Sequence, residues 1–258
     1  MIPADRLRRG LARHRSIAIA VSGGVDSMTL AHIAHGVTAA RMIHAISPAV
    51  PAIATARVRR HAAAHGWRLD IVDAGEFGDA RYIANPVNRC YFCKLNLYGT
   101  IRDLAEGPVA SGTNTDDLGD YRPGLKAADE LDVIHPYVEA GIGKAEVYRL
   151  ATALGLDDLA ALPAQPCLSS RIETDIPVRK ADLAFIETAE DRLRGRIGAG
   201  AVLRCRITHA GVIVELADND DAGPAAADLV AALCRDTGRT FLGTRPYRRG
   251  AAFLRAGA

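Results

Sequence analysis

Residues 17–27 have the sequence IAIAVSGGVDS, and this stretch decides the fold. The first five residues form a short apolar run, which predicts a buried strand. The glycines that follow let backbone N–H groups approach a phosphate closely. The N-terminus of the next helix adds unpaired N–H groups and a positive dipole end. Strand, glycine loop and helix in this order predict a phosphate-binding loop more strongly than an ordinary strand-to-helix turn.

Short apolar runs alternate with helical patterns along the first 160 or so residues. Further strands are predicted at residues 42–46, 69–72, 109–111 and 133–134, and helices at about 27–34, 52–66, 91–105 and 144–154. Strands that alternate with helices of about 10–15 residues are typical of a parallel sheet with helices on both faces. We therefore expect residues 1–162 to form an α/β domain.

The pattern changes after a proline-rich stretch at residues 163–166. A helix is predicted at 179–193, and two runs of alternating polarity at 202–207 and 212–216 predict a β-hairpin. An alanine-rich helix is expected from Pro224 to about Cys234, and residues 240–242 are a candidate strand. Residues 163–258 are thus predicted to form a second, smaller α+β domain.

The composition excludes several classes of protein. The chain has 258 residues, is 49% hydrophobic and carries a formal net charge of +2. No apolar run approaches the length of about 18 residues that a membrane span needs, and no secretory signal is visible. The nearly balanced charge gives no support for a dedicated nucleic-acid binder. Five cysteines without a signal indicate a reducing compartment, so we expect a cytoplasmic protein.

Further motifs follow the loop in order. They are NPVNRCYFCK at 85–94, SGTNTDD at 111–117, PCLSSR at 166–171 and RCR at 204–206. Together with SGGVDS they resemble the LarE-type ATP-dependent sulfur transferases, a group within the PP-loop ATP pyrophosphatases. The resemblance covers about residues 15–216. One departure is IETDI at 172–176, where that family usually carries an aromatic residue followed by glycine.

The resemblance implies a fold and a reaction. The fold is a parallel-sheet PP-loop ATP pyrophosphatase domain (adenine nucleotide alpha hydrolase-like) at 1–162, followed by a substrate and sulfur-transfer domain at 163–258. The reaction uses ATP and Mg²⁺ to adenylate a carboxylate of pyridinium-3,5-biscarboxylic acid mononucleotide. Sulfur then replaces an oxygen, which yields a precursor of the nickel-pincer nucleotide of lactate racemase. The partners implied are a small nucleotide substrate, a sulfide donor and further copies of the chain in a homo-oligomer.

Site residues follow from the same motifs. The nucleotide is expected at Ser22, Gly23, Gly24, Asp26, Ser27, Gly112 and Asn114. The substrate phosphate is expected at Arg204 and Arg206, which share one face of a strand, with added donors from Ser170 and Arg171. Carboxylates that resemble metal positions are Asp116, Asp117, Asp120, Glu190 and Glu215, although a solvated acidic surface explains them almost as well.

The cysteines leave two sulfur sources open. In one branch of the family, the cysteine that matches Cys167 gives up its own sulfur and becomes dehydroalanine. In the other, it joins a Cys-x-x-Cys pair, here Cys90 and Cys93, to hold a 4Fe-4S cluster. All three positions of the second branch are present, and we favour the cluster over a sacrificial Cys167 and over zinc. Cys205 and Cys234 are predicted to be core residues.

Three other functions compete with sulfur transfer to a small nucleotide. A tRNA-thiolating enzyme shares the loop and the cysteines but needs a broad basic surface. An ammonia-dependent amide-forming ligase of the NAD synthetase kind leaves the cysteines and the Arg204/Arg206 pair unused. A non-catalytic adenine-nucleotide sensor has no need of a thiol cluster.

Overall fold

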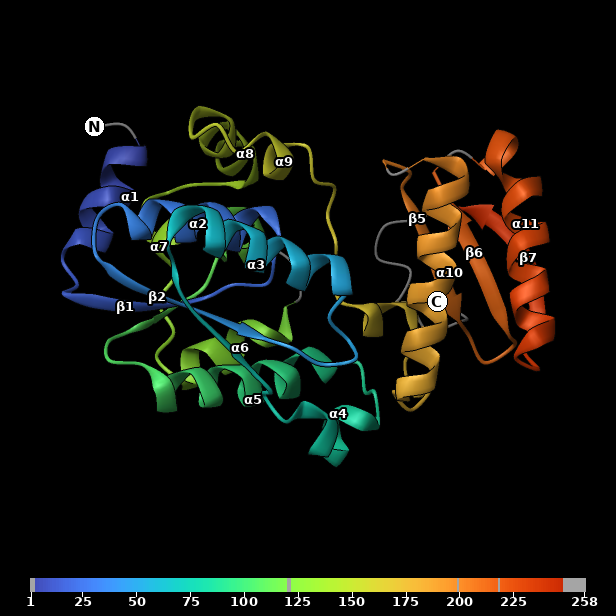
Figure 1. Ribbon diagram of the computed structural model, residues 1–258. Helices are drawn as coiled ribbons and strands as arrows, with labels where there is room; N and C mark the ends of the chain where they lie inside the picture. Colours follow the sequence, from blue (N-terminus) through green and yellow to red (C-terminus); the bar gives the residue numbers. More distant parts are fainter. Residues whose placement is uncertain (1–2, 120–121, 199, 218, 248–258) are drawn as a thin grey trace. The chain divides into compact units, whose positions relative to one another are not determined.

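The computed structural model describes residues 3–119, 122–198, 200–217 and 219–247, without the side chains of 219 and 220. The chain divides into two compact units (Figure 1). The first consists of Met1–Tyr82 and Asn88–Gln165, and the second of Ile83–Val87 and Pro166–Ala258. The short segment Ile83–Val87 therefore belongs to the second unit, although the residues before and after it in the sequence belong to the first.

The first unit is built on a parallel sheet. Its strands are β1 (Ser16–Ala20), β2 (Ala39–Ala45), β3 (Arg68–Val72) and β4 (Val109–Ala110), and they lie in the order β3-β2-β1-β4. Side chains alternate along β1, so Ile17 and Ile19 face one core cluster and Ala18 faces another. The predicted α/β class, with helices on both faces of a parallel sheet, is confirmed.

Helices of the first unit cover both faces of this sheet (Figure 1). The α-helices are α1 (Pro3–Ala12), α2 (Val25–His35), α3 (Ala52–His65), α4 (Ala80–Ile83), α5 (Arg89–Leu104), α6 (Pro123–Glu130), α7 (Pro136–Glu139), α8 (Lys144–Ala153) and α9 (Asp157–Ala160). Two 3₁₀ turns, η1 (Glu76–Gly78) and η2 (Thr115–Gly119), lie in connecting loops. Within the described ranges, no helix has the length and apolarity needed to cross a membrane.

The second unit is a small α+β structure. The turn η3 (Leu168–Arg171) leads into α10 (Lys180–Ile197), and β5 (Leu203–Ile207) and β6 (Val212–Leu216) form the antiparallel hairpin that the alternating runs predict. Helix α11 (Asn219–Asp236) follows, and β7 (Phe241–Pro246) adds to β6 in parallel. Helices α10 and α11 pack against this sheet and against each other.

Two predicted elements differ in the structure. The strand predicted at 133–134 is wrong, because Ile134 forms only an isolated parallel bridge with Ala110. Pro136 begins α7 two residues later and leaves no room for a ladder. Helix α11 starts five residues before Pro224, so the proline lies inside the helix rather than opening it. The helix packs on β6 and β7 although the proline removes one hydrogen bond.

Asn85 joins the segment Ile83–Val87 to the rest of the second unit. Its side-chain amide donates hydrogen bonds to the carbonyl oxygens of Glu173 and Ile176, each at 2.8 Å. Its φ is 55°, in the left-handed region that asparagine tolerates better than most residues. Asn85 is only 1% exposed. A variant without the amide therefore leaves the two carbonyl oxygens without this donor, in a place away from bulk water.

Asn85→Ala should therefore lower the free energy of unfolding by about 3 kcal/mol, from two hydrogen bonds of about 1 kcal/mol each and the strain of alanine at positive φ. Asn85→Gly loses the same bonds without the strain and should lose about 2 kcal/mol. Urea unfolding of both variants checks this order. Unchanged stability of Asn85→Ala would show that the segment is not held in this way.

Candidate functional site

The 22–27 loop lies where the strand order of the sheet reverses. From β1 the chain proceeds to β2 and β3 on one side, and β4 then pairs with β1 on the other side. In open α/β sheets, ligands bind in the crevice at the carboxyl ends of the strands at such a switch point. The two loops that flank it here are residues 22–27, after β1, and residues 111–117, after β4.

Close backbone packing holds the 22–27 loop. Gly23 has a φ of 81°, and a Cβ built on it would lie 2.7 Å from the carbonyl oxygen of Ala54 in α3. The buried guanidinium of Arg57, also in α3, donates to the carbonyl oxygen of Gly23 at 2.7 Å. Only glycine satisfies both the φ and the space at this position.

The hydroxyl groups of the loop bond to one another. The Ser27 side-chain oxygen accepts from the Ser22 N–H at 3.0 Å and lies 3.1 Å from the Ser22 hydroxyl. It also donates to the carbonyl oxygen of Gly24 at 3.3 Å. Gly24 is the N-cap of α2, and no side chain caps that helix end. The loop thus presents backbone N–H groups at a helix N-terminus, which is an arrangement suited to an anion.

The second flanking loop touches the first. A Cβ at Gly112 would lie 2.7 Å from the backbone nitrogen of Ser27, so glycine is required for this approach. Asn114, only 3% exposed, donates its side-chain amide to one oxygen of Asp26 at 3.2 Å. The residues predicted to contact the nucleotide therefore lie together, namely the 22–27 loop, Gly112 and Asn114.

Asp26 has a second partner that the sequence analysis missed. The ammonium group of Lys144, the first residue of α8, donates to the other oxygen of Asp26 at 2.5 Å. Both side chains are partly exposed, at 32% for Lys144 and 27% for Asp26, so a ligand can reach them. One signal was present in the sequence. The chain has only four lysines against 28 arginines, and one of the four stands at a predicted helix start.

The acidic residues of the 111–117 loop hold the loop and α8 together. Asp116 accepts from the backbone N–H of Lys144 at 3.1 Å, and Asp117 accepts from that of Asn114 at 3.1 Å and pairs with Arg122 at 2.7 Å. Asp120 lies outside the described residues. The assignment of Asp117 to Mg²⁺ stays a prediction, and the Asp117 contacts are those of a loop-stabilising residue.

The cysteine motif of the first unit lies on α5. Cys90 and Cys93 are one helical turn apart, so their side chains share one side of the helix, and both are half-buried. Cys167 belongs to the second unit, where it is half-buried at the start of η3. None of the five cysteines, all of them in described ranges, forms a disulfide. Cys205 and Cys234 are buried in the core of the second unit, and burial raises the pKa of both thiols.

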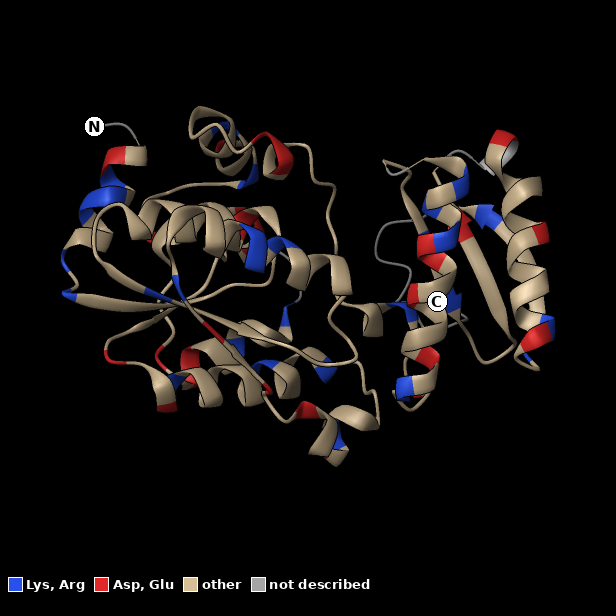
Figure 2. Cartoon of the chain, viewed as in Figure 1, with Lys and Arg blue, Asp and Glu red and all other residues tan. Residues whose placement is uncertain are grey.

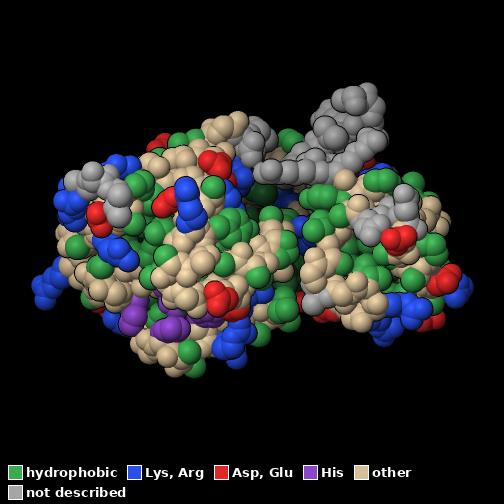
Figure 3. Space-filling view, turned by 90° about the horizontal axis from the view of Figure 1, so that it is seen from above, with side chains coloured by type: hydrophobic (Ala, Val, Ile, Leu, Met, Phe, Trp, Pro, Cys, Tyr) green, Lys and Arg blue, Asp and Glu red, His purple; other side chains and the backbone are tan. Residues whose placement is uncertain are grey.

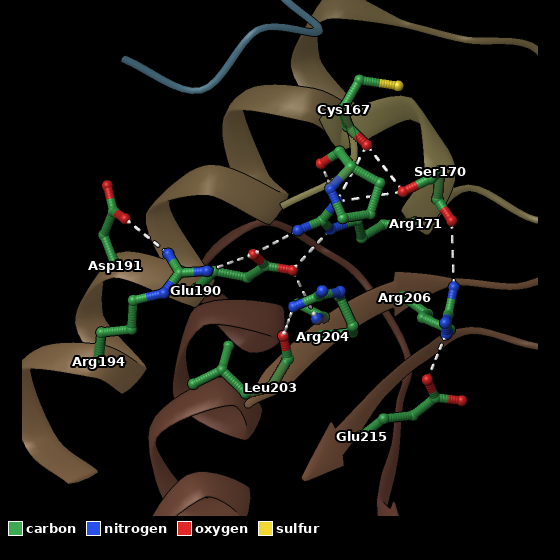
Figure 4. A network of polar contacts seen from close by, with 12 residues as sticks. Cys167, Ser170, Arg171, Glu190, Asp191, Arg194, Leu203, Arg204, Arg206 and Glu215 are labelled. Carbon is green, nitrogen blue, oxygen red and sulfur yellow. Dashed lines mark hydrogen bonds and ion pairs between the residues drawn. The ribbon is translucent and has the colours of Figure 1, made fainter. Parts of the chain in front are cut away.

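Arg171 fixes the loop that carries Cys167 (Figure 4). Its guanidinium donates to the carbonyl oxygens of Pro166 at 2.5 Å and Cys167 at 3.0 Å. The Ser170 hydroxyl also donates to the Cys167 carbonyl, at 2.7 Å. Each of these bonds is accepted by a backbone carbonyl oxygen. They therefore position Cys167 without involving its thiol.

Glu190, on α10, neutralises this arginine. Its carboxylate accepts two bonds from Arg171, at 2.9 and 3.1 Å, one from Arg194 at 2.8 Å and one from the backbone N–H of Cys205 at 3.1 Å. Burial raises the pKa of this carboxyl, but Arg171, Arg194 and nearby Arg204 together outweigh that effect and lower it. The predicted metal role of Glu190 gains no support from these surroundings, which are those of an ion-pair partner.

Arg204 and Arg206 project from the same face of β5, near η3 (Figure 4). Arg206 donates to the carboxylate of Glu215 at 2.5 Å and to the carbonyl oxygen of Ser170 at 3.1 Å. Arg204 donates to the carbonyl oxygen of Leu203 at 2.6 Å, and burial with the neighbouring Arg171 lowers its pKa. A guanidinium whose charged form is disfavoured by burial and by a neighbouring cation gains from an anionic ligand.

Glu215 is fully buried and also pairs with Arg245 of β7 at 2.7 Å. Like Glu190, it has the surroundings of an ion-pair partner rather than of a metal ligand. The second unit therefore gathers four of the predicted residues around the Cys167 loop, namely Ser170, Arg171, Arg204 and Arg206, and the two glutamates offset part of the positive charge.

Comparisons with known proteins place the chain among its relatives. The uncharacterized protein slr1717 of Synechocystis sp. is 38% identical over 204 residues, which cover 77% of this chain and 75% of that protein. The chain belongs to the slr1717 family. Within this similarity group, the uncharacterized protein MJ0830 of Methanocaldococcus jannaschii is 28% identical over 211 residues, or 80% of each chain.

A third relative is an enzyme that matches less than half of the chain. The pyridinium-3,5-bisthiocarboxylic acid mononucleotide synthase of Lactiplantibacillus plantarum is 32% identical over 114 residues, 43% of this chain and 41% of the synthase. This partial match supports the resemblance drawn from the motifs. No family model matches the chain.

The bonds of Glu190 should make the stability of the protein depend on pH. Glu190→Gln leaves buried Arg171 without its counter-charge, and breaking a buried pair costs about 3–5 kcal/mol. Because the pKa of Glu190 is lower in the folded than in the unfolded state, its contribution is fully present well above pH 4.5 and is lost as the pH falls below that value. The stability gap between wild type and variant should therefore shrink on acidification.

Urea unfolding at several pH values measures this gap. Asp191→Asn is the matched control, since Asp191 is the next residue, pairs with the same Arg194 and is 60% exposed. It should change stability by less than about 1 kcal/mol. Equal losses in the two variants, or a gap independent of pH, would contradict the role given to Glu190.

Proposed function

We propose that this protein is an ATP-dependent sulfur transferase that converts a carboxylate of a small nucleotide into a thiocarboxylate, with pyridinium-3,5-biscarboxylic acid mononucleotide as the substrate. The observation that carries the proposal lies at the switch point of the sheet. There the side chains of Asn114 and Lys144 both bond to the carboxylate of Asp26 in the 22–27 loop. The partial similarity to the L. plantarum synthase supports the choice of substrate.

The switch point of the first unit fits ATP that reacts at its α-phosphate. Backbone N–H groups of the 22–27 loop and the N-terminus of α2 would hold the pyrophosphate. Asp26 would hold Mg²⁺, with Asn114 and Lys144 orienting its two oxygens. Lys144 also supplies a positive charge next to the phosphates, so the departing pyrophosphate is stabilised by charge as well as by hydrogen bonds.

The second unit has arginines that fit a mononucleotide phosphate. Arg204 and Arg206 share one face, are each only 8% exposed, and lie near Ser170 and the Cys167 loop. A carboxylate oxygen of the substrate attacks the α-phosphorus of ATP and expels pyrophosphate. A sulfur nucleophile then attacks the acyl carbon and expels AMP, which carries away the original oxygen. Adenylation is needed because oxide is a very poor leaving group.

The cysteines fit a source of sulfur. Cys90 and Cys93 are half-buried on one side of α5, and thiolates at this spacing are suited to two corners of an iron–sulfur cluster. Cys167 would be the third ligand. When bound, a 4Fe-4S cluster with three protein thiolates offers a fourth iron that can carry sulfide. The chain's own contribution is to position Cys167, through the bonds of Arg171 and Ser170 to its backbone.

The charge distribution favours a small substrate over tRNA. Figure 2 shows Lys and Arg spread over both units with acidic residues among them. Along α10, for example, Glu190 and Asp191 stand next to Arg192 and Arg194. Two of the buried arginines of the second unit, Arg171 and Arg206, are also paired with Glu190 and Glu215, which suits a single phosphate better than a polyanionic backbone.

Turnover should give AMP and pyrophosphate, because the loop holds the phosphates that leave and no Walker lysine is present to serve the γ-phosphate. Asp26→Asn should lower the rate about 100-fold or more, since it removes the charge that Mg²⁺ needs. The assay is separation of nucleotide products by anion-exchange chromatography. Asp103→Asn, an exposed change on α5, is the control and should leave the rate unchanged. Products of ADP and phosphate would show that the site works differently.

Protein purified without oxygen should be brown and carry about four irons per chain. Alanine at Cys90, Cys93 or Cys167 should remove the iron together with multiple turnover, whereas Cys234→Ala, a buried control, should keep both. Iron and sulfide assays and absorption spectra measure this. An iron-free protein that reacts once and loses the mass of H₂S at Cys167 would replace the cluster by the sacrificial mechanism and leave the overall reaction in place.

A further inference from the structure

Three histidines that the proposed reaction does not use lie together in the first unit. His32 comes from α2, and His61 and His65 come from α3. One ring nitrogen of each lies within 4.8 Å of the corresponding nitrogens of the other two. Figure 3 shows histidine side chains gathered on one side of this unit, at the surface. His61 is buried, His32 is half-buried and His65 is exposed, so the group opens to solvent at one edge.

The ring of His61 is held in one orientation by a carboxylate. Its Nε2 lies 3.0 Å from a carboxylate oxygen of Asp158 in α9, and a carboxylate can only accept, so Nε2 carries the hydrogen. The Nδ1 of neutral His61 then has a lone pair, which faces the Nε2 of His32 at 2.9 Å. A histidine that donates one N–H to a carboxylate and directs its other nitrogen at a shared point is the usual arrangement around a protein-bound metal ion.

We propose that His32, His61 and His65 form a binding site for a divalent late first-row transition metal ion such as Zn²⁺, with Asp158 orienting His61 from outside the ligand set. Imidazole suits zinc, nickel and copper, whereas Mg²⁺ and Ca²⁺ require oxygen ligands. Tetrahedral ligands about 2.05 Å from zinc are about 3.3 Å apart, so the His32–His61 nitrogen pair needs to open by only a few tenths of an ångström. A water molecule would complete the four ligands on the exposed side.

The surroundings fit a site with a fixed ring geometry. Trp67, which is 7% exposed, lies edge-on to His32 with ring centroids 4.6 Å apart and shields one side of the cluster. His32 and His65 are also in edge-to-face contact, at 4.5 Å. Packing of this kind limits the rotation of the rings, so little conformational entropy would be lost on binding the ion.

The place of the cluster suggests what the ion would do. Helix α2 begins in the 22–27 loop and carries His32 two turns later, while α3 contacts that loop through Ala54 and Arg57 and carries His61 and His65 towards its other end. An ion at the cluster would cross-link these two helices away from the loop. It would therefore stabilise the packing that sets the shape of the loop, without contacting the nucleotide.

Zinc titration of the full chain tests the proposal. The three half-buried thiols are removed first, by Cys90→Ala, Cys93→Ala and Cys167→Ala, so that zinc binding to them is not measured; Cys205 and Cys234 stay buried. After chelation and dialysis, isothermal titration calorimetry should show one Zn²⁺ per chain, and zinc should raise the Tm. His65→Ala, an exposed ligand, should weaken binding more than 100-fold. Asp158→Asn should weaken it by about 10–100-fold, as outer carboxylates do.

His35→Ala is the matched control, because His35 is an exposed histidine on the same helix as His32 and lies outside the cluster. It should leave zinc affinity and the zinc-dependent rise in Tm unchanged. Cobalt(II) in the same protein should give the visible absorption of a nitrogen and oxygen site without a sulfur charge-transfer band. Zinc binding that survives in His65→Ala, or that is lost in His35→Ala, would overturn the proposed ligand set.

Discussion

The close approach of two backbone segments to the 22–27 loop is the constraint on which the site depends. A Cβ at Gly23 would lie 2.7 Å from the Ala54 carbonyl oxygen, and one at Gly112 would lie 2.7 Å from the Ser27 nitrogen. Contacts of this kind fix the loop from both sides, by α3 and by the loop after β4. Because the N–H groups of the loop are positioned before any ligand arrives, little reorganisation is needed when a phosphate binds.

The second unit solves a different physical problem, which is to keep several guanidinium groups close together. Arg171, Arg204 and Arg206 are all buried, and their mutual repulsion is offset by Glu190 and Glu215. The result is a preorganised and mostly buried cationic group next to Cys167 whose positive charge is offset in part. Such a group can bind a phosphate without attracting nucleic acid over a wide area, in keeping with the formal net charge of +2.

Much of this architecture could be predicted from local sequence. The strands, the parallel α/β class and the hairpin follow from apolar runs and alternation, and the loop from its glycines. The bridge at Ile134 was predicted as a strand because two apolar residues look alike in either setting. What could not be predicted depends on distant contacts. Lys144 reaches Asp26 from 118 positions away, and Asn85 joins the second unit through residues nearly 90 positions later. The ion pairs of Glu190 could not be predicted either, because its arginine partners come from η3 and its own helix, and its metal role stays a prediction.

In the proposed reaction, the protein uses ATP to replace an oxygen of a nucleotide carboxylate by sulfur. The most direct measurement is mass spectrometry of pyridinium-3,5-biscarboxylic acid mononucleotide after incubation with the anaerobic protein, ATP, Mg²⁺ and isotopically labelled sulfide. We expect a product in which labelled sulfur replaces a carboxylate oxygen, formed together with an equal amount of AMP. An unchanged mononucleotide in a reaction that thiolates tRNA, or a carboxamide product formed from added ammonia, would contradict it.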